Sequence, residues 1–195
     1  KNINIFGVHL DRKSNMDAVN SLKDQIKSFG VETTFLNASA NDPNTRLKCI
    51  EHLKNYNKAH IKIFLHSLAF GSLKPLIGNK ESEIINQKQI EMTLDIMANS
   101  LVYWTQDLYK SKLLSKGSHI LAMTSSGNKR QWQSYGAVSA TKCALESYIR
   151  QLSLELAPME ISCNSIQAGV TDTPALRKIP GNIKMIENAI KNNPS

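Results

Sequence analysis

Tyr135 and Lys142 are the two residues of this chain whose types and spacing could do chemistry together. They stand seven positions apart at the start of an amphipathic run that continues to Ala157, so on a helix they would project from the same face. A nearby ammonium favours the phenolate over the phenol, which suits the tyrosine to donating a proton or a hydrogen bond. A bare Tyr-x6-Lys is more often an ordinary surface pair, so the elements around it must decide.

Those elements alternate along the chain. Short apolar stretches predict strands at 3–8, 31–36, 61–68, 119–123 and 161–166, and amphipathic patterns predict helices at 16–29, 43–53, 81–114, 135–157 and 183–190. Ser14 to Asp17 resembles a capping box, and Asp42 followed by Pro43 predicts another helix start. Leu47, Ile50 and Leu53 are expected to be buried. The apolar stripe from Ile90 to Leu108 predicts either core or a subunit interface.

The alternation predicts a doubly wound α/β domain with a parallel sheet covered on both faces. Ligands of such sheets bind beyond the carboxyl ends of the strands. Polar or glycine-bearing loops follow every predicted strand, at 11–14, 37–42, 67–71, 124–127 and 167–173. We therefore expect these five loops to line one crevice.

Composition excludes several classes of protein. With 195 residues, 41% hydrophobic and 21% charged, the chain is expected to form one globular domain over residues 1–195. No apolar run approaches the roughly 20 residues of a membrane span, and the first residues lack the features of a signal peptide, so we expect a cytoplasmic protein without membrane insertion. The three cysteines lack the spacing of a metal site. The net charge of +8 is spread over scattered lysines, which does not favour nucleic-acid binding.

Several segments carry a resemblance to a known family. They are Thr124-Ser-Ser, Tyr135 with Lys142, Ala144-Leu-Glu, residues 152–158, residues 163–173 and His66-Ser-Leu-Ala-Phe. With these segments the chain resembles the short-chain dehydrogenase/reductases, and most closely their enoyl-acyl-carrier-protein reductase branch. Ordinary members space the pair as Tyr-x3-Lys, which would place the tyrosine at Val138. Val138 cannot donate a proton, and the wider spacing is that of enoyl reductases.

Two departures from the family qualify the resemblance. Residue 1 falls where the second strand of the family should begin, and neither the glycine-rich loop that takes the cofactor pyrophosphate nor the last strand is found. The chain is therefore expected to be a fragment of a longer protein or a degenerate relative. In addition, Ser125 stands where enoyl reductases often carry a second tyrosine, and Met97 stands where ordinary members carry an asparagine.

The resemblance implies NAD(P)H-dependent reduction of the 2,3 double bond of an enoyl thioester, carried on acyl carrier protein in fatty acid synthesis. Tyr135 would meet the charge that develops on the thioester oxygen, Lys142 would bind the nicotinamide ribose, and Ser125 is the third catalytic candidate. The implied cofactor-binding residues are Arg12, Lys13, Asn37, Ala38, Ser67, Leu68, Ala69, Thr124, Lys142, Ala168, Gly169, Val170 and Thr171. Homodimers or homotetramers would form through the long helix and the Tyr135 helix.

Two other functions stay open at this point. One is reduction of a 3-oxoacyl or 2,4-dienoyl thioester on the same scaffold, and the other is a non-catalytic dinucleotide-binding protein. The choice of cofactor rests on the first loop, where Asp11 could take a ribose hydroxyl and Arg12 could take a 2′-phosphate. The position of Arg12 predicts NADPH, with NADH as the alternative.

Overall fold

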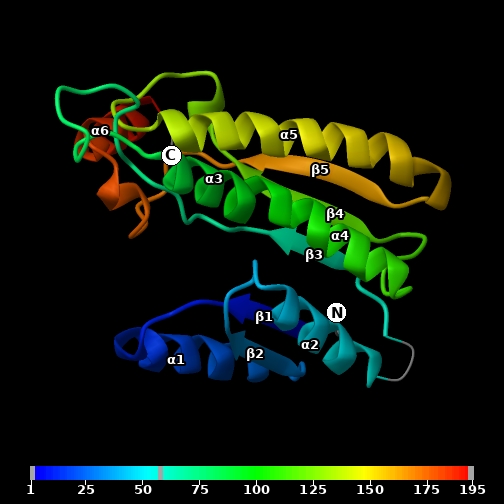
Figure 1. Cartoon of the computed structure of the whole chain (residues 1–195). Helices are drawn as coiled ribbons and strands as arrows, with labels where there is room; N and C mark the ends of the chain where they lie inside the picture. The colour runs from blue at the N-terminus through cyan, green and yellow to red at the C-terminus, as the bar shows by residue number, and fades with distance from the viewer. Residues whose placement is uncertain (1–2, 57–58, 193–195) are drawn as a thin grey trace.

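The computed structural model describes residues 3–56 and 59–192. Its strands form two sheets in which every pair is parallel (Figure 1). The smaller sheet pairs β1 (Ile5–His9) with β2 (Thr33–Asn37), and the larger has the order β3 (Ile63–His66), β4 (His119–Thr124), β5 (Ser162–Gln167). The α/β class and the parallel pairing predicted from the sequence are thus confirmed.

The helices alternate with these strands. They are α1 (Met16–Lys27), α2 (Pro43–Lys54), α3 (Gln87–Leu94), α4 (Ser100–Lys110), α5 (Gly136–Leu156) and α6 (Asn182–Asn192). A π-helical segment, Asp95–Asn99, joins α3 to α4, so the two form one long helical run. No helix among the described residues is long and apolar enough to cross a membrane.

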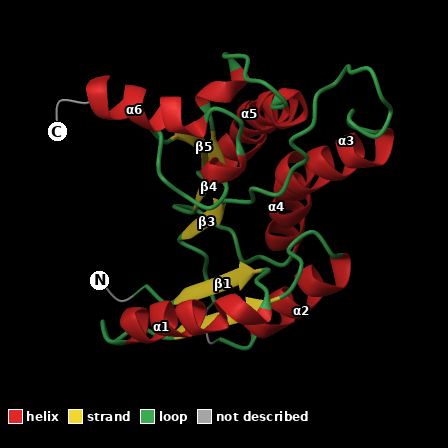
Figure 2. Ribbon diagram, turned by 90° about the vertical axis from the view of Figure 1, so that its left-hand side faces the viewer, coloured by secondary structure: helices red, strands yellow, loops and turns green. Residues whose placement is uncertain are grey.

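The predicted single sheet is interrupted between β1 and β3. These two strands are neighbours in both views (Figures 1 and 2), yet no ladder of hydrogen bonds joins them within the described residues. A continuous doubly wound sheet would run β2, β1, one further strand, β3, β4, β5. The interruption therefore falls at the position of that further strand.

The core lies on one face of the larger sheet. Leu101 and Leu108 of α4, Ile120 of β4 and Leu145 of α5 are almost fully buried together, and Figure 2 shows α4 and α5 on the same side of the strands. Alternate side chains of a strand point to opposite faces. Ile63 and Leu65 consequently point away from this core and remain 51% exposed. The expectation of cover on both faces is wrong for this part of the described chain.

Polar contacts hold the smaller sheet against the long helix. The Arg46 guanidinium on α2 lies 2.8 Å from the Asp107 carboxylate on α4, and Trp104 donates its indole N–H to the Ala40 carbonyl at 2.7 Å. Phe6 and Val8 of β1 pack against the same core cluster. The two sheets therefore share one core although they are not hydrogen-bonded to each other.

Helix starts follow the expected chemistry in one place and depart from it in two. Asp42 caps α2 by accepting from the Asn44 amide at 3.1 Å, as predicted. The capping box expected at Ser14 is wrong, because residues Lys13–Asn15 form a 3₁₀ turn and the Asn15 side chain donates from Nδ2 to the Asp11 carboxylate instead. The long helix begins at Gln87 rather than near residue 81, with a capping box between Asn86 and Gln89.

One expected core position is also wrong. Leu47 is 58% exposed, whereas Cys49 and Ile50 on the same helix are buried. The helix α2 packs against α4, and this contact selects a face that contains Cys49 rather than Leu47. In the long helix, Met97, Leu101, Trp104 and Leu108 are buried within the chain, so this part of the stripe is core.

Candidate active site

Tyr135 and Lys142 both lie at the start of α5, where this helix covers the end of β4. Tyr135 is the residue just before the first helical turn, with φ −99° and ψ 1°, so it precedes the helix instead of lying inside it. Lys142 lies about two turns further along. Their exposed fractions are only 8% and 6%. A solvated surface pair is therefore excluded.

The Lys142 ammonium is buried without a carboxylate partner among the residues that the structure describes. It donates one hydrogen bond, of 2.7 Å, to the backbone carbonyl of Met123 in β4. Burial lowers the pKa of Lys142 from 10.5 to about 8, because the charged form loses solvation. The protein thus holds a weakly compensated cation at the carboxyl end of its central strand, and such a cation can bind hydroxyl or anionic groups of a ligand.

The Tyr135 phenol is positioned by the loop that follows β4. Its hydroxyl lies 3.5 Å from Ser125 Oγ, which itself accepts from the Gly127 amide at 3.1 Å. Gly127 has no side chain to separate the ring from the loop: a Cβ at this position would overlap Tyr135 Cε1 and lie 3.1 Å from Cδ1. The structure therefore brings together Tyr135 and Ser125, two of the three predicted catalytic candidates.

The same loop is tied to α5 by a carboxylate. Glu146 accepts from Thr124 Oγ1 at 2.6 Å and from Asn128 Nδ2 at 2.5 Å. Thr124 was predicted to contact the cofactor, but in this structure its hydroxyl holds the loop. Sequence reasoning missed Gly127 and Glu146 as parts of the site, although Glu146 belongs to the Ala-Leu-Glu segment that carried the family resemblance.

The remaining candidates of the larger sheet follow its strand ends. Ser67, Leu68 and Ala69 come directly after β3, and residues 168–171 come directly after β5. The latter are exposed, and a Cβ on Gly169 would meet no atom within 4 Å. Both segments therefore lie at the same edge as Tyr135 and Lys142, since parallel strands end on one side of the sheet.

The candidates of the smaller sheet form a second group at the ends of β1 and β2. The Asn37 side chain accepts from the Asp11 amide and donates to the Asp11 carbonyl, both at 3.0 Å, and the Ala38 amide donates to His9 at 2.8 Å. Arg12 and Lys13 are exposed beside them. In Figure 1 the arrowheads of β1 and β3 point the same way, which places both groups at the same end of the fold.

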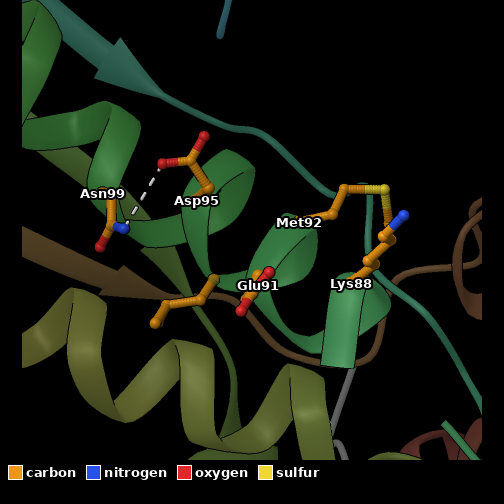
Figure 3. Close-up of a pocket in the computed structure, with 6 residues that line it drawn as sticks. Lys88, Glu91, Met92, Asp95 and Asn99 are labelled. Carbon is orange, nitrogen blue, oxygen red and sulfur yellow. Dashed lines mark hydrogen bonds between the residues drawn. The ribbon is translucent and has the colours of Figure 1, made fainter. Parts of the chain in front are cut away.

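A pocket on the other side of the long helix contains none of these candidates. It has a volume of about 410 Å³ and is lined by residues of α3 and the π segment, namely Lys88, Glu91, Met92, Leu94, Asp95 and Asn99 (Figure 3). The dashed line in Figure 3 is the contact from Asn99 to Asp95. Within the described ranges no cluster of three or more metal-ligating side chains exists.

The chain is similar to known proteins in sequence and in fold. A family model described as Enoyl-(Acyl carrier protein) reductase matches residues 2–195. The chain belongs to this family. Relatives include the enoyl-acyl-carrier-protein reductase (NADH) of Enterococcus faecalis, 32% identical over 112 residues and 57% of this chain. The enoyl-acyl-carrier-protein reductase (NADPH) of Staphylococcus aureus is 28% identical over 121 residues and 60% of this chain.

The matched regions are partial. They cover 43% and 44% of these two relatives, so the chain matches less than half of their length. Among solved structures, an enoyl-acyl-carrier-protein reductase of Bacillus cereus with NADP+ and indole naphthyridinone superimposes with a TM-score of 0.83 over 98% of this chain and 71% of its own. At 21% identity this likeness establishes the Rossmann-like fold.

The described residues of this enoyl reductase family member fit the two ends of a nicotinamide dinucleotide. The buried ammonium of Lys142 has hydrogen-bonding capacity left for ribose hydroxyls, and the exposed guanidinium of Arg12 makes no hydrogen bond or ion pair with the described residues. For the pyrophosphate between these ends, the described chain offers no glycine-rich loop leading into a helix N-terminus.

Proposed function

We propose that the complete protein reduces the 2,3 double bond of an enoyl thioester with a reduced nicotinamide cofactor. The observation that carries this proposal is the buried Tyr-x6-Lys pair at the carboxyl end of β4 in a member of the enoyl reductase family. The hydride transferred to the β-carbon is supplied by the bound cofactor.

The residues of this chain would handle the charge and the proton. As the β-carbon is reduced, negative charge develops on the thioester oxygen, and the Tyr135 hydroxyl is the donor that would stabilise it. Ser125 Oγ would orient that hydroxyl through the contact of 3.5 Å. Lys142 would hold the ribose hydroxyls and add positive charge, and the burial of both side chains strengthens these interactions by keeping water away.

Removing the Tyr135 hydroxyl tests the proposed role. Tyr135→Phe should lower turnover of a crotonyl-type thioester by about 100-fold or more, because a donor aimed at developing charge is lost. Cofactor binding, measured by fluorescence titration, should stay nearly unchanged. Tyr109→Phe, at an exposed position on α4, is the matched control and should behave like the unaltered protein. Equal turnover in Tyr135→Phe would remove Tyr135 from the mechanism.

The acyl carrier is the next part of the proposal. We propose acyl carrier protein as the thiol partner, since the net charge of +8 favours an acidic partner. Comparing one acyl chain on carrier protein and on coenzyme A tests this choice. Replacing the enoyl chain by 3-oxoacyl and 2,4-dienoyl chains tests the alternative reactions, and cofactor titration of the complete protein tests the non-catalytic alternative.

The first loop favours NADPH over NADH. Asp11 Oδ2 lies 2.9 Å from His9 Nδ1, and Asp11 Oδ1 accepts from Asn15 at 3.3 Å. These hydrogen bonds, that of His9 first, lower the pKa of Asp11. An engaged carboxylate of this kind is a poor partner for a ribose hydroxyl. The Arg12 side chain is exposed and makes no hydrogen bond or ion pair with the described residues. Its guanidinium can therefore donate hydrogen bonds to a 2′-phosphate.

Arg12→Ala separates the two cofactors. It should lower kcat/KM for NADPH by about 10-fold or more, because a phosphate contact is lost, and should change kcat/KM for NADH much less. Lys23→Ala, a charge removal in α1 away from this loop, is the control. If the unaltered protein has the higher kcat/KM with NADH, Asp11 rather than Arg12 governs the choice and NADH is the cofactor.

We also propose a cytoplasmic homodimer or homotetramer assembled through the outer faces of α3, α4 and α5. The buried part of the long-helix stripe does not support this interface, because those side chains belong to the chain's own core. Support comes from outward apolar residues on these helices: Ile90 on α3 and Leu154 on α5 are exposed. Sedimentation of the complete protein tests the assembly, and cell fractionation tests the location.

A further inference from the structure

His66 is a buried, titratable residue to which the proposed reaction assigns no role. It is the last residue of β3 and only 3% exposed. Its Nε2 atom lies 2.8 Å from Ser100 Oγ, at the start of α4. Ser100 is fully buried, and its hydroxyl also lies 2.7 Å from the backbone carbonyl of Ile96 in the π segment. One hydroxyl thus joins a strand end to the distorted turn of the long helix.

These two contacts determine the tautomer of the imidazole. A backbone carbonyl can only accept, so the single hydroxyl proton of Ser100 goes to Ile96. The Ser100 oxygen must then accept from His66, which means that Nε2 carries the ring proton. Burial, with Lys142 as the second cause, lowers the pKa of His66 to about 4 and outweighs a smaller opposing contribution from the residue's own backbone. The ring is therefore neutral, and with the proton on Nε2 the Nδ1 atom is an acceptor.

That acceptor is unpaired. Nδ1 is buried and has no hydrogen-bond partner among the described residues, and an unpaired buried acceptor is costly. The nearest strand partner of His66 is Ala122, and the carbonyl of the following residue, Met123, holds Lys142 at 2.7 Å. An ammonium has three donors, and only this one is engaged within the described residues. A spare acceptor and two spare donors therefore lie at the ends of adjacent strands.

We propose that His66 is a positioning residue for Lys142, its Nδ1 accepting from a buried hydroxyl or water molecule that also accepts from the Lys142 ammonium. Ser100 keeps the ring in the tautomer that this bridge needs. The bridge stabilises the charged form of the lysine and directs the ammonium toward the end of β4. The consequence for catalysis rests on the proposed function, whereas the bridge itself does not.

The other groups around Lys142 leave His66 as the residue to vary. Tyr135 approaches from the start of α5, and Glu146, one turn further along the helix, is engaged with Thr124 and Asn128. From the long helix, Met97 packs in one buried cluster with Tyr135 and Val138, and it is uncharged.

Two substitutions test the roles of the two ring nitrogen atoms separately. His66→Gln can place its amide where Nε2 reaches Ser100 but leaves no acceptor at the Nδ1 position. His66→Asn can place its oxygen near the Nδ1 position but cannot reach Ser100. The titration of Lys142 is followed by NMR of labelled lysine side chains in the complete protein, which needs no turnover.

His66→Gln should lower the pKa of Lys142 by about 0.5 unit or more, because the charged form loses a stabilising bridge, and His66→Asn should leave it nearly unchanged. The pH at which cofactor binding weakens should move in the same way. Imidazole nitrogen shifts in the unaltered protein should report the Nε2–H tautomer, and Ser100→Ala should let both tautomers appear.

An Nδ1–H tautomer in the unaltered protein, or equal Lys142 titration in both His66 variants, would overturn the proposal. The tautomer is measured in the unaltered protein, so this measurement tests the proposal even if a variant does not fold. A fully active Tyr135→Phe together with the expected lysine shift would refute the reaction and leave the His66 assignment intact.

Discussion

At the scale of single residues, the burial of the Lys142 ammonium opposes the stability of the folded chain. Its ammonium is 6% exposed and donates to one backbone carbonyl, so the folded chain pays for desolvation that a purely structural residue would avoid. The drop of its pKa from 10.5 to about 8 expresses that cost, since a pKa shift is a difference in free energy between protonation states. Such an arrangement is expected where a ligand supplies the missing partners.

Lys142→Met should therefore stabilise the chain in the absence of ligands. Near neutral pH we expect a gain of about 1–2 kcal/mol in the free energy of unfolding, after allowing for the lost hydrogen bond to Met123. The folded lysine loses its proton at lower pH than the unfolded one, so between about pH 8 and pH 10.5 the unfolded state binds more protons. The stability of the unaltered chain relative to the variant should then rise with pH.

Urea denaturation across that pH range measures the difference in the free energy of unfolding between the two proteins. The other titrating groups are common to both proteins, so their contributions cancel in this difference. The stabilisation by Lys142→Met should shrink as pH rises through this window. A variant that is less stable than the unaltered chain near neutral pH, with a gap independent of pH, would contradict a desolvated Lys142.

At the scale of elements, the loop after β4 decides where the Tyr135 ring lies. Ser125 caps a 3₁₀ turn by accepting from the Gly127 amide. The Glu146 carboxylate on α5 accepts from Thr124, just before this turn, and from Asn128, its last residue. Ser134 adopts φ +60° just before Tyr135, which turns the chain into the helix. The catalytic candidate is thus placed by a compact loop and not by the helix alone.

Gly127→Ala tests this placement. The added Cβ would overlap Tyr135 Cε1, so the ring must shift, and a shift of this size should reduce turnover by about 10- to 100-fold. Ser126→Ala, in the same turn, is the matched control and should keep most of the activity. Thermal melting accompanies the turnover assay. If Gly127→Ala remains fully active and equally stable, the loop tolerates a side chain and does not fix Tyr135.

At the scale of the whole molecule, two sheets and one long helical run form a shared core. Asn41 donates to Asp95 at 2.5 Å, and Arg46 with Asp107 and Trp104 with Ala40 add further links between the smaller sheet and the long helix. These links position the Arg12 loop relative to the Tyr135 site. They also leave the outer surfaces of α3, α4 and α5 available for assembly.

Leu154→Lys tests that assembly. Leu154 is 71% exposed on α5, and a lysine there should shift a dimer or tetramer toward smaller species in sedimentation, because a buried interface disfavours an unpaired charge. Leu22→Lys on α1, which lies far from α5 in both views (Figures 1 and 2), should leave the assembly unchanged. A monomeric unaltered protein at micromolar concentration, or a Leu154→Lys assembly equal to it, would refute the interface.

Features that depend on neighbouring residues could be predicted from the amino-acid sequence alone. Periods of two and of 3.6 residues predicted the strands and helices in their order, the Asp42-Pro43 start was correct, and the spacing of Tyr135 and Lys142 predicted their common location. Each of these signals is local, because a strand alternation, a cap or a helical spacing needs only residues within a few positions of one another.

Contacts between groups far apart in the sequence could not be predicted and became visible in the folded chain. The Ile85 amide pairs with the Pro75 carbonyl, so the chain before Gln87 follows a loop instead of starting the long helix early. The backbone of Asp11 is hydrogen-bonded by the Asn37 side chain, and the tautomer of His66 is set by Ser100. These partners are up to 34 positions apart. No local pattern encodes them, because a hydrogen bond between distant residues exists only once packing has excluded the water that would otherwise compete for it.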